Sequence, residues 1–136
     1  MRTVLFAVSL LLAGASLAGN KPLMECDEKA QTRLDVGPCL DHMLEQAQQE
    51  HSEAVAATKK TMAVLSDVTG RLDPVLSFDG AQREFENYRA LNCAWYFEQL
   101  SPGTGAGDAQ KACRIKLTRY RTQELKDLLP DPSSED

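Results

Sequence analysis

Four cysteines are the residues whose type and spacing most clearly indicate a defined chemistry. Cys26, Cys39, Cys93 and Cys113 form an even set. In an oxidising compartment such a set predicts two disulfides, although four cysteines allow three connectivities. We favour Cys26–Cys39 and Cys93–Cys113, because each of these pairs closes a short local loop. A zinc site is disfavoured, since no pair has the Cys-x-x-Cys spacing typical of such sites.

The two histidines do not form a catalytic or metal-binding pair. His42 and His51 are nine residues apart, so on one helix they point in directions about 180° apart. The chain contains no Gly-x-Ser-x-Gly, His-Glu-x-x-His or Walker sequence. We therefore predict a protein that is not an enzyme and that carries no cofactor and no metal ion.

Residues 1–18 have the pattern of a secretory signal peptide. Arg2 precedes an apolar run over residues 4–12, and residues 16–18 (Ser-Leu-Ala) form a small-x-small cleavage site. The run is too short to span a bilayer. Asn20 stands where a lipoprotein signal has its cysteine. The pattern predicts a periplasmic or secreted protein without a membrane anchor, and it supports the oxidising environment that the disulfides require.

The charge of the chain is negative. It has 15 basic and 20 acidic residues, and removal of Arg2 with the signal leaves 14 basic against 20 acidic ones, a net charge of −6. Such a balance disfavours nucleic acid and anionic membranes as partners. It suits a basic protein partner, although negative charge also serves solubility alone.

Helical periodicity extends over most of the chain from residue 19 to residue 129. From Cys39 to Gly70 the apolar residues recur at three- and four-residue steps, which predicts one long helix, preceded by Asp35 as a possible capping residue. A third helix follows Asp73, and no segment alternates as a strand does. The fold class is therefore all-α: a small, disulfide-stapled helical bundle with a C-terminal helical hairpin. Residues 130–136 read as a disordered acidic tail.

The hairpin spans residues 81–121 and is the most informative part of the sequence. Its two helices flank a Gly-rich turn at residues 101–107, after which Asp108 is a natural N-cap. Cys93 and Cys113 then lie at similar distances from the bend, which allows a disulfide between the helices. The aromatic run 95–97 is typical of a core, with a binding surface as the alternative.

Three polar residues of the hairpin stand out. Gln82 and Arg89 share one face of the third helix, and Arg121 lies on the last helix. A half-buried arginine requires a carboxylate or helix carbonyls as its partner. We favour a polar clamp that holds the hairpin together; the alternative is a surface for an acidic or sugar partner.

The hairpin resembles the LprI-type lysozyme inhibitor domain, a family of secreted bacterial proteins. The similarity lies in Ala-Gln-x-x-Phe-x-x-Tyr-Arg-x-x-x-Cys over residues 81–93 and in Cys-x-x-x-Leu-Thr-x-x-Arg-x-x-x-Leu over residues 113–125. It adds Thr118 to the clamp residues, and the Cys26/Cys39 pair resembles an upstream pair in the family. The family usually has Trp where this chain has Phe85.

The resemblance implies an all-α, disulfide-bonded envelope protein that binds another protein and, for some members, inhibits lysozyme. A basic lysozyme is then the partner, and Trp95, Tyr96 and the loop residue Thr104 are the candidate contact surface. The alternative is a periplasmic structural or interaction protein, such as an immunity-type partner of another secreted factor, with no role toward lysozyme. A small-ligand site between the helices has no support in the sequence.

Overall fold

The computed structural model describes residues 21–129, so the signal peptide predicted for residues 1–18 and the tail predicted for residues 130–136 lie outside it. Five helical elements follow one another: α1 (Pro22–Lys29), the 3-10 turn η2 (Arg33–Asp35), α2 (Val36–Thr69), α3 (Asp73–Leu100) and α4 (Ala106–Asp127). No strand occurs within these described residues. The all-α prediction is confirmed.

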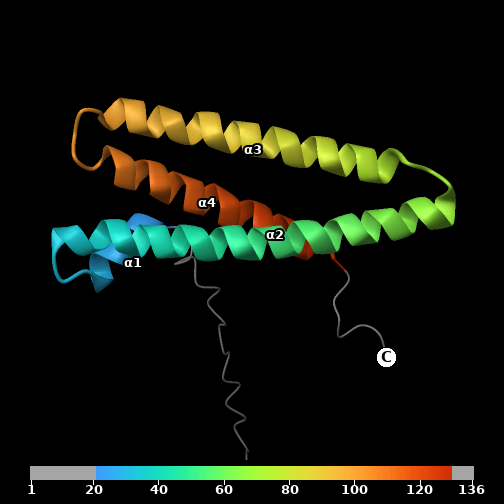
Figure 1. Cartoon of the computed structure of the whole chain (residues 1–136), viewed down its shortest axis with the longest axis horizontal. Helices are drawn as coiled ribbons and strands as arrows, with labels where there is room; N and C mark the ends of the chain where they lie inside the picture. Colours follow the sequence, from blue (N-terminus) through green and yellow to red (C-terminus); the bar gives the residue numbers. More distant parts are fainter. Residues whose placement is uncertain (1–20, 130–136) are drawn as a thin grey trace, which may run out of the picture.

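Three of the helices form an antiparallel arrangement (Figure 1). The long helices α2 and α3 run in opposite directions, and α4 returns between them and packs against both. The short helix α1 packs against α2 and α4 near the start of α2. The C-terminal hairpin predicted from the sequence is therefore formed by α3 and α4.

Local sequence signals explain most of the helix ends. Pro22 and Pro74 stand in the first turns of α1 and α3, where a missing N–H costs nothing. Gly70 ends α2 in the left-handed conformation, with φ of 69°, which glycine adopts without steric cost. In the α3–α4 turn, a Cβ on Gly103 would lie 2.7 Å from the Leu100 carbonyl oxygen, so this turn requires glycine.

Asp35 takes the predicted N-cap position of α2 but makes no side-chain bond to that helix, and the N-cap prediction for Asp108 is wrong. Asp35 precedes α2, but its carboxylate accepts hydrogen bonds from the Thr32 N–H (2.8 Å) and hydroxyl (2.9 Å) and so closes η2 instead. Asp108 lies within the first turn of α4, because the helix already begins at Ala106, whose N–H donates to the Gly103 carbonyl at 3.2 Å. A carboxylate in this turn still complements the helix dipole.

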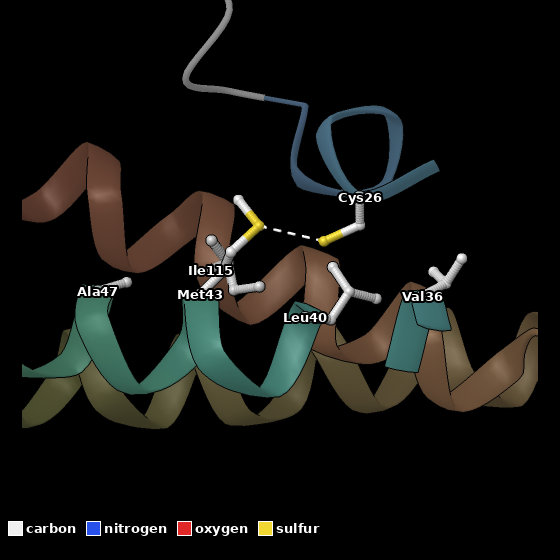
Figure 2. Close-up of a cluster of buried hydrophobic side chains, with 6 residues drawn as sticks. All are labelled: Cys26, Val36, Leu40, Met43, Ala47 and Ile115. Carbon is white, nitrogen blue, oxygen red and sulfur yellow. Dashed lines mark hydrogen bonds between the residues drawn. The ribbon is translucent and has the colours of Figure 1, made fainter. Parts of the chain in front are cut away.

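The main apolar core lies where α1, α2 and α4 meet (Figure 2). It consists of six buried residues: Cys26, Val36, Leu40, Met43, Ala47 and Ile115. The dashed line in Figure 2 joins Cys26 Sγ to Met43 Sδ, 3.2 Å apart. Because the Cys26 sulfur is in a disulfide and carries no proton, we describe this as a sulfur–sulfur contact. The core is small, which gives the covalent cross-links a large share of the stability.

Both disulfides join the favoured pairs. Cys26–Cys39 ties α1 to the start of α2 with Cα atoms 5.8 Å apart, and Cys93–Cys113 ties α3 to α4 with Cα atoms 5.5 Å apart. These separations are typical of disulfides. On the chain-entropy model, each contributes about 3 kcal/mol to stability.

Candidate functional site

A buried polar network joins the three long helices. At its centre lies His51 of α2, whose side chain is held between Gln82 of α3 and Thr122 of α4. The distance from His51 Nε2 to Gln82 Nε2 is 2.6 Å, and that from His51 Nδ1 to Thr122 Oγ1 is 3.3 Å. All three residues are less than 9% exposed. The network therefore links α2, α3 and α4 through side chains that water barely reaches.

The hydrogen-bond partners assign the protonation state of His51. Gln82 Oε1 accepts from Arg121 Nε at 3.1 Å, so the Gln82 amide nitrogen must face His51 and donate to its Nε2. Thr122 Oγ1 donates to the Thr118 carbonyl at 2.8 Å, so it accepts the Nδ1 proton of His51. His51 is thus neutral, with its proton on Nδ1.

The surroundings of His51 also favour its neutral form. Burial lowers the pKa of His51 below its ordinary value, the positive charges of Arg89 and Arg121 lower it further, and Glu86 opposes them. The Phe85 ring lies 5.5 Å from the His51 ring. The neutral imidazole therefore fits both the hydrogen bonds and the local charge.

The second arm of the network holds Arg89. Its Nη1 donates to Thr118 Oγ1 at 2.8 Å, and that hydroxyl in turn donates to the Arg114 carbonyl at 2.7 Å. Arg89 and Arg121 lie 5.4 and 5.8 Å from the centroid of the Phe85 ring, close enough for cation–π attraction. Phe85 thus contacts both guanidinium groups of the network.

The structure brings together the four residues singled out in the hairpin, in two pairs. Arg89 contacts Thr118, and Arg121 contacts Gln82. A carboxylate or carbonyl partner was expected for each arginine; Arg121 has one in Glu124 at 2.7 Å, whereas Arg89 uses a hydroxyl. Sequence reasoning missed His51 and Thr122 as members, although the helical period of the long helix places His51 in line with Leu40 and Ala47, which are buried.

The aromatic segment of α3 lies on the outside of the molecule, so the expectation that Trp95 belongs to the core is wrong. Trp95 is 56% exposed and its ring makes an edge-on contact with Tyr96 at 4.8 Å. Of the 28 residues of α3, only Gln82 and Cys93 are buried. The polar network and the disulfide occupy the packed face, and Trp95 is turned away from it.

Exposed residues at steps of four and three mark an outer stripe on α3, which we call the α3 ridge: Glu84, Tyr88, Leu91, Trp95 and Glu98. Tyr88 is 55% and Leu91 75% exposed. This spacing keeps the five side chains on one face of a helix. The ridge has an apolar, aromatic middle and an acidic residue at each end. Thr104 is exposed in the turn after α3 and does not line the hollow beside Trp95.

A groove lies next to the α3 ridge, between α1, α3 and α4. Its volume is about 490 Å³. It adjoins a second hollow of about 460 Å³ beside Trp95, and the two share Tyr88, Asn92 and Tyr96. Tyr88 and Trp95 therefore belong to the α3 ridge and also line these hollows.

Within residues 21–129, no helix is long and apolar enough to cross a bilayer. In that same range no three His, Cys, Asp or Glu side chains are grouped so that they could hold a metal ion.

Comparison with known proteins gives one family and one relative. The family model described as "Lysozyme inhibitor LprI" matches residues 26–125. An uncharacterized protein of Rhizobium meliloti (strain 1021) is 30% identical over 135 residues, which cover 95% of this chain and 96% of the relative. No solved structure gives a significant match.

Proposed function

The chain belongs to the LprI lysozyme inhibitor family, and from this membership we propose that it is an exported, non-enzymatic protein-binding module that inhibits lysozyme. The two disulfides support export to the periplasm or beyond, because such bonds persist in oxidising compartments. The observation that carries the proposal is the α3 ridge, with its exposed Trp95.

The composition of the α3 ridge suits a protein interface. Trp and Tyr are the residues most enriched among those that dominate binding energy, and Leu91 beside them extends the apolar contact. Exposed apolar side chains that gather in one patch are typical of interaction surfaces. Trp95 is the expected anchor of the contact.

The charge of the α3 ridge suits a basic lysozyme. Glu84 and Glu98 are exposed at its two ends, and the whole chain carries a net charge of −5. Complementary charges steer the encounter and raise the association rate. A convex helical ridge that enters the lysozyme cleft, where two carboxylates act on the glycan, keeps the substrate out.

The α3 ridge is a better contact element than the turn that contains Thr104. The ridge is part of a continuous helix, so its side chains are already positioned. A turn of residues 101–105 has no regular structure and pays a larger ordering cost on binding. We therefore place the main contact on the α3 ridge at Trp95, with Tyr96 beside it at the edge of the groove and Thr104 outside the contact.

The test is inhibition of lysozyme turnover by the oxidised chain from Gly19 onward. Trp95→Ala is expected to weaken inhibition about 30-fold, the effect of losing a binding hot spot of about 2 kcal/mol. Tyr120→Ala removes an exposed aromatic residue of α4 and is the matched control, and Thr104→Ala should also leave potency unchanged. Glu84→Gln with Glu98→Gln should slow association and reduce its salt dependence.

The absence of inhibition at micromolar protein, against c-type and other lysozymes, would overturn the lysozyme assignment. The alternative is then a periplasmic interaction protein, such as an immunity-type partner of another secreted factor. Equal potency of Trp95→Ala and the unmodified chain would remove the α3 ridge from the mechanism while leaving inhibition itself in place.

A further inference from the structure

The groove between α1, α3 and α4 has the size and lining of a small-molecule site. Its volume of about 490 Å³ falls within the range of ligand pockets, roughly 300–1,000 Å³. Twelve residues line it: Lys21, Pro22, Leu23, Met24, Tyr88, Asn92, Tyr96, Ala109, Ala112, Cys113, Lys116 and Leu117. Most of these side chains are apolar, and a few polar ones are placed among them, which is the usual composition of such sites.

The charge of the groove is opposite to that of the chain. In a protein with a net charge of −5, the twelve lining residues include two lysines and no acidic residue. Neither Lys21 nor Lys116 forms an ion pair with any residue between 21 and 129. Lys116 instead lies 5.9 Å from the Tyr120 ring. Two ammonium groups therefore remain available to an anion.

The start of α1 adds polar donors to the same wall. Lys21 precedes the helix without a side-chain cap, and the first backbone bond to its carbonyl comes from the Glu25 N–H at 3.0 Å. The N–H groups of Leu23 and Met24, in the first turn of α1, have no acceptor within the helix. They complement the charge of the two lysines.

We propose that this groove binds a single-chain anionic amphiphile, a fatty-acid carboxylate, with its tail against the apolar wall and its head paired with both Lys21 and Lys116. An uncharged apolar ligand leaves the ammonium groups unused, and a cationic one is repelled by them. A basic protein such as lysozyme is likewise a poor occupant of the groove. The groove shares Tyr88 with the α3 ridge, but its two lysines have the opposite charge to the acidic ends of the ridge.

The chain carries its own reporter for this binding. Trp95 is the only tryptophan in the sequence, and it lines the hollow that shares Tyr88, Asn92 and Tyr96 with the groove. Its ring contacts Tyr96 at 4.8 Å. A ligand that displaces Tyr96 or water beside it is expected to shift the Trp95 emission.

The experiment titrates dodecanoate, below its micelle concentration, into the oxidised chain and follows Trp95 emission. Saturable one-to-one binding is expected. Dodecyl maltoside and dodecyltrimethylammonium, which share the tail but carry neutral and cationic heads, should bind at least about tenfold more weakly, since two exposed ion pairs together contribute roughly that factor. Calorimetry gives the stoichiometry independently of fluorescence.

Variants locate the site. Lys21→Gln with Lys116→Gln should weaken dodecanoate about tenfold and bring it to the level of the neutral amphiphile. Lys60→Gln with Lys126→Gln, two exposed lysines outside the groove, is the matched control and should have no effect. All four lysines are exposed, so the variants are expected to fold, which circular dichroism checks.

Three results would overturn the proposal. The first is no saturable dodecanoate binding; the second is equal affinity for all three head groups; the third is unchanged affinity in the Lys21/Lys116 variant. A concentration-dependent dimer, detected by sedimentation and indifferent to dodecanoate, would assign the groove to a second copy of the chain instead.

Discussion

Acidification is expected to destabilise the fold through His51. Its neutral ring accepts a hydrogen bond from the Gln82 amide on one side and donates a hydrogen bond to the Thr122 hydroxyl on the other. A second proton on His51 Nε2 would face the Gln82 amide nitrogen across 2.6 Å, donor against donor. Rotation of the Gln82 amide moves the conflict to Arg121, since the amide nitrogen would then face the Arg121 Nε.

The direction of the pH effect follows from the lowered pKa of His51 in the folded chain. Unfolded His51 titrates near its ordinary value, about 6.5, so below that pH the unfolded state binds a proton that the folded state does not. The stabilising effect of the network is complete above pH 6.5 and is lost as the pH falls toward the folded pKa. The slope is at most about 1.4 kcal/mol per pH unit.

The total free energy of unfolding that acidification removes through His51 is limited by the hydrogen bonds of the network. One buried donor left without an acceptor costs about 1–3 kcal/mol, and His51, Gln82 and Thr122 are all buried. Urea unfolding at pH 7.5 and at steps down to pH 4.5 measures this loss, with an expected fall of the midpoint by about 1 M. Carboxylates in ion pairs add their own acid sensitivity, which the comparison of variants removes.

His51→Gln is the informative variant, because it keeps a polar side chain but cannot titrate. It should be less stable than the unmodified chain at pH 7.5, and the difference should shrink as the pH falls. His42→Gln changes an exposed histidine of the same helix and should differ from the unmodified chain by the same amount at every pH. Parallel pH profiles for the unmodified chain and His51→Gln would refute the assignment of a neutral His51 network.

Three further predictions concern stability and are measured by urea unfolding at neutral pH. Cys93→Ser with Cys113→Ser should lower the free energy of unfolding by about 3 kcal/mol, because it releases a cross-link between residues 20 apart; an unchanged midpoint would contradict this. Gly70→Ala should cost about 1 kcal/mol, because Gly70 has φ of 69°, whereas Gly107→Ala, at a helical position with open space, should cause no loss. Phe85→Leu should cost about 1–2 kcal/mol through lost contacts with two arginines. The cost should be smaller in a background without Arg89 and Arg121, and an equal cost in both backgrounds would contradict the cation–π assignment.

The sequence predicts the helices and the hairpin well because their signals are local. The three- and four-residue spacing after Cys39, the break at Gly70 and the Gly-rich turn each involve residues close together in the chain. The disulfide pairs follow from the same short separations, 13 and 20 residues. The two capping predictions are also local, but the outcome depends on partners three residues away: the Asp35 carboxylate accepts from Thr32, and α4 begins where the Ala106 N–H donates to the Gly103 carbonyl.

The polar network is less predictable because its contacts are distant in sequence. His51 and Thr122 are 71 residues apart, and Gln82 and Arg121 are 39 apart. Periodicity places His51 on a buried stripe but says nothing about which polar side chains meet it. Arg89 and Arg121 could be recognised as residues in need of partners, whereas the hydroxyl that Arg89 uses could not be identified without the packing of α4 against α3.

The main wrong prediction concerns which face of α3 packs inward, because Trp95 was expected in the core and is exposed. The cause is physical. Apolar residues occur on both sides of this helix: Phe85 on the side of the network, and Leu91 and Trp95 on the opposite side. Such a helix offers no single apolar stripe, so periodicity does not determine its orientation. Cys93 and Gln82 determine it, through a disulfide and through hydrogen bonds to two other helices.

This arrangement separates the residues that hold α3 from those that are free to bind. Because the disulfide and the network fix the helix, Tyr88, Leu91 and Trp95 contribute little to folding and remain exposed. Substitutions on the α3 ridge should therefore change binding while leaving the unfolding free energy within about 0.5 kcal/mol, as is usual at surface positions. Substitutions in the polar network should instead lower the unfolding free energy, and they should weaken binding only when the fold itself is lost. A ridge variant that unfolds as readily as a network variant would mean that the ridge is part of the fold, and the assignment of a free binding surface to α3 would fail with it.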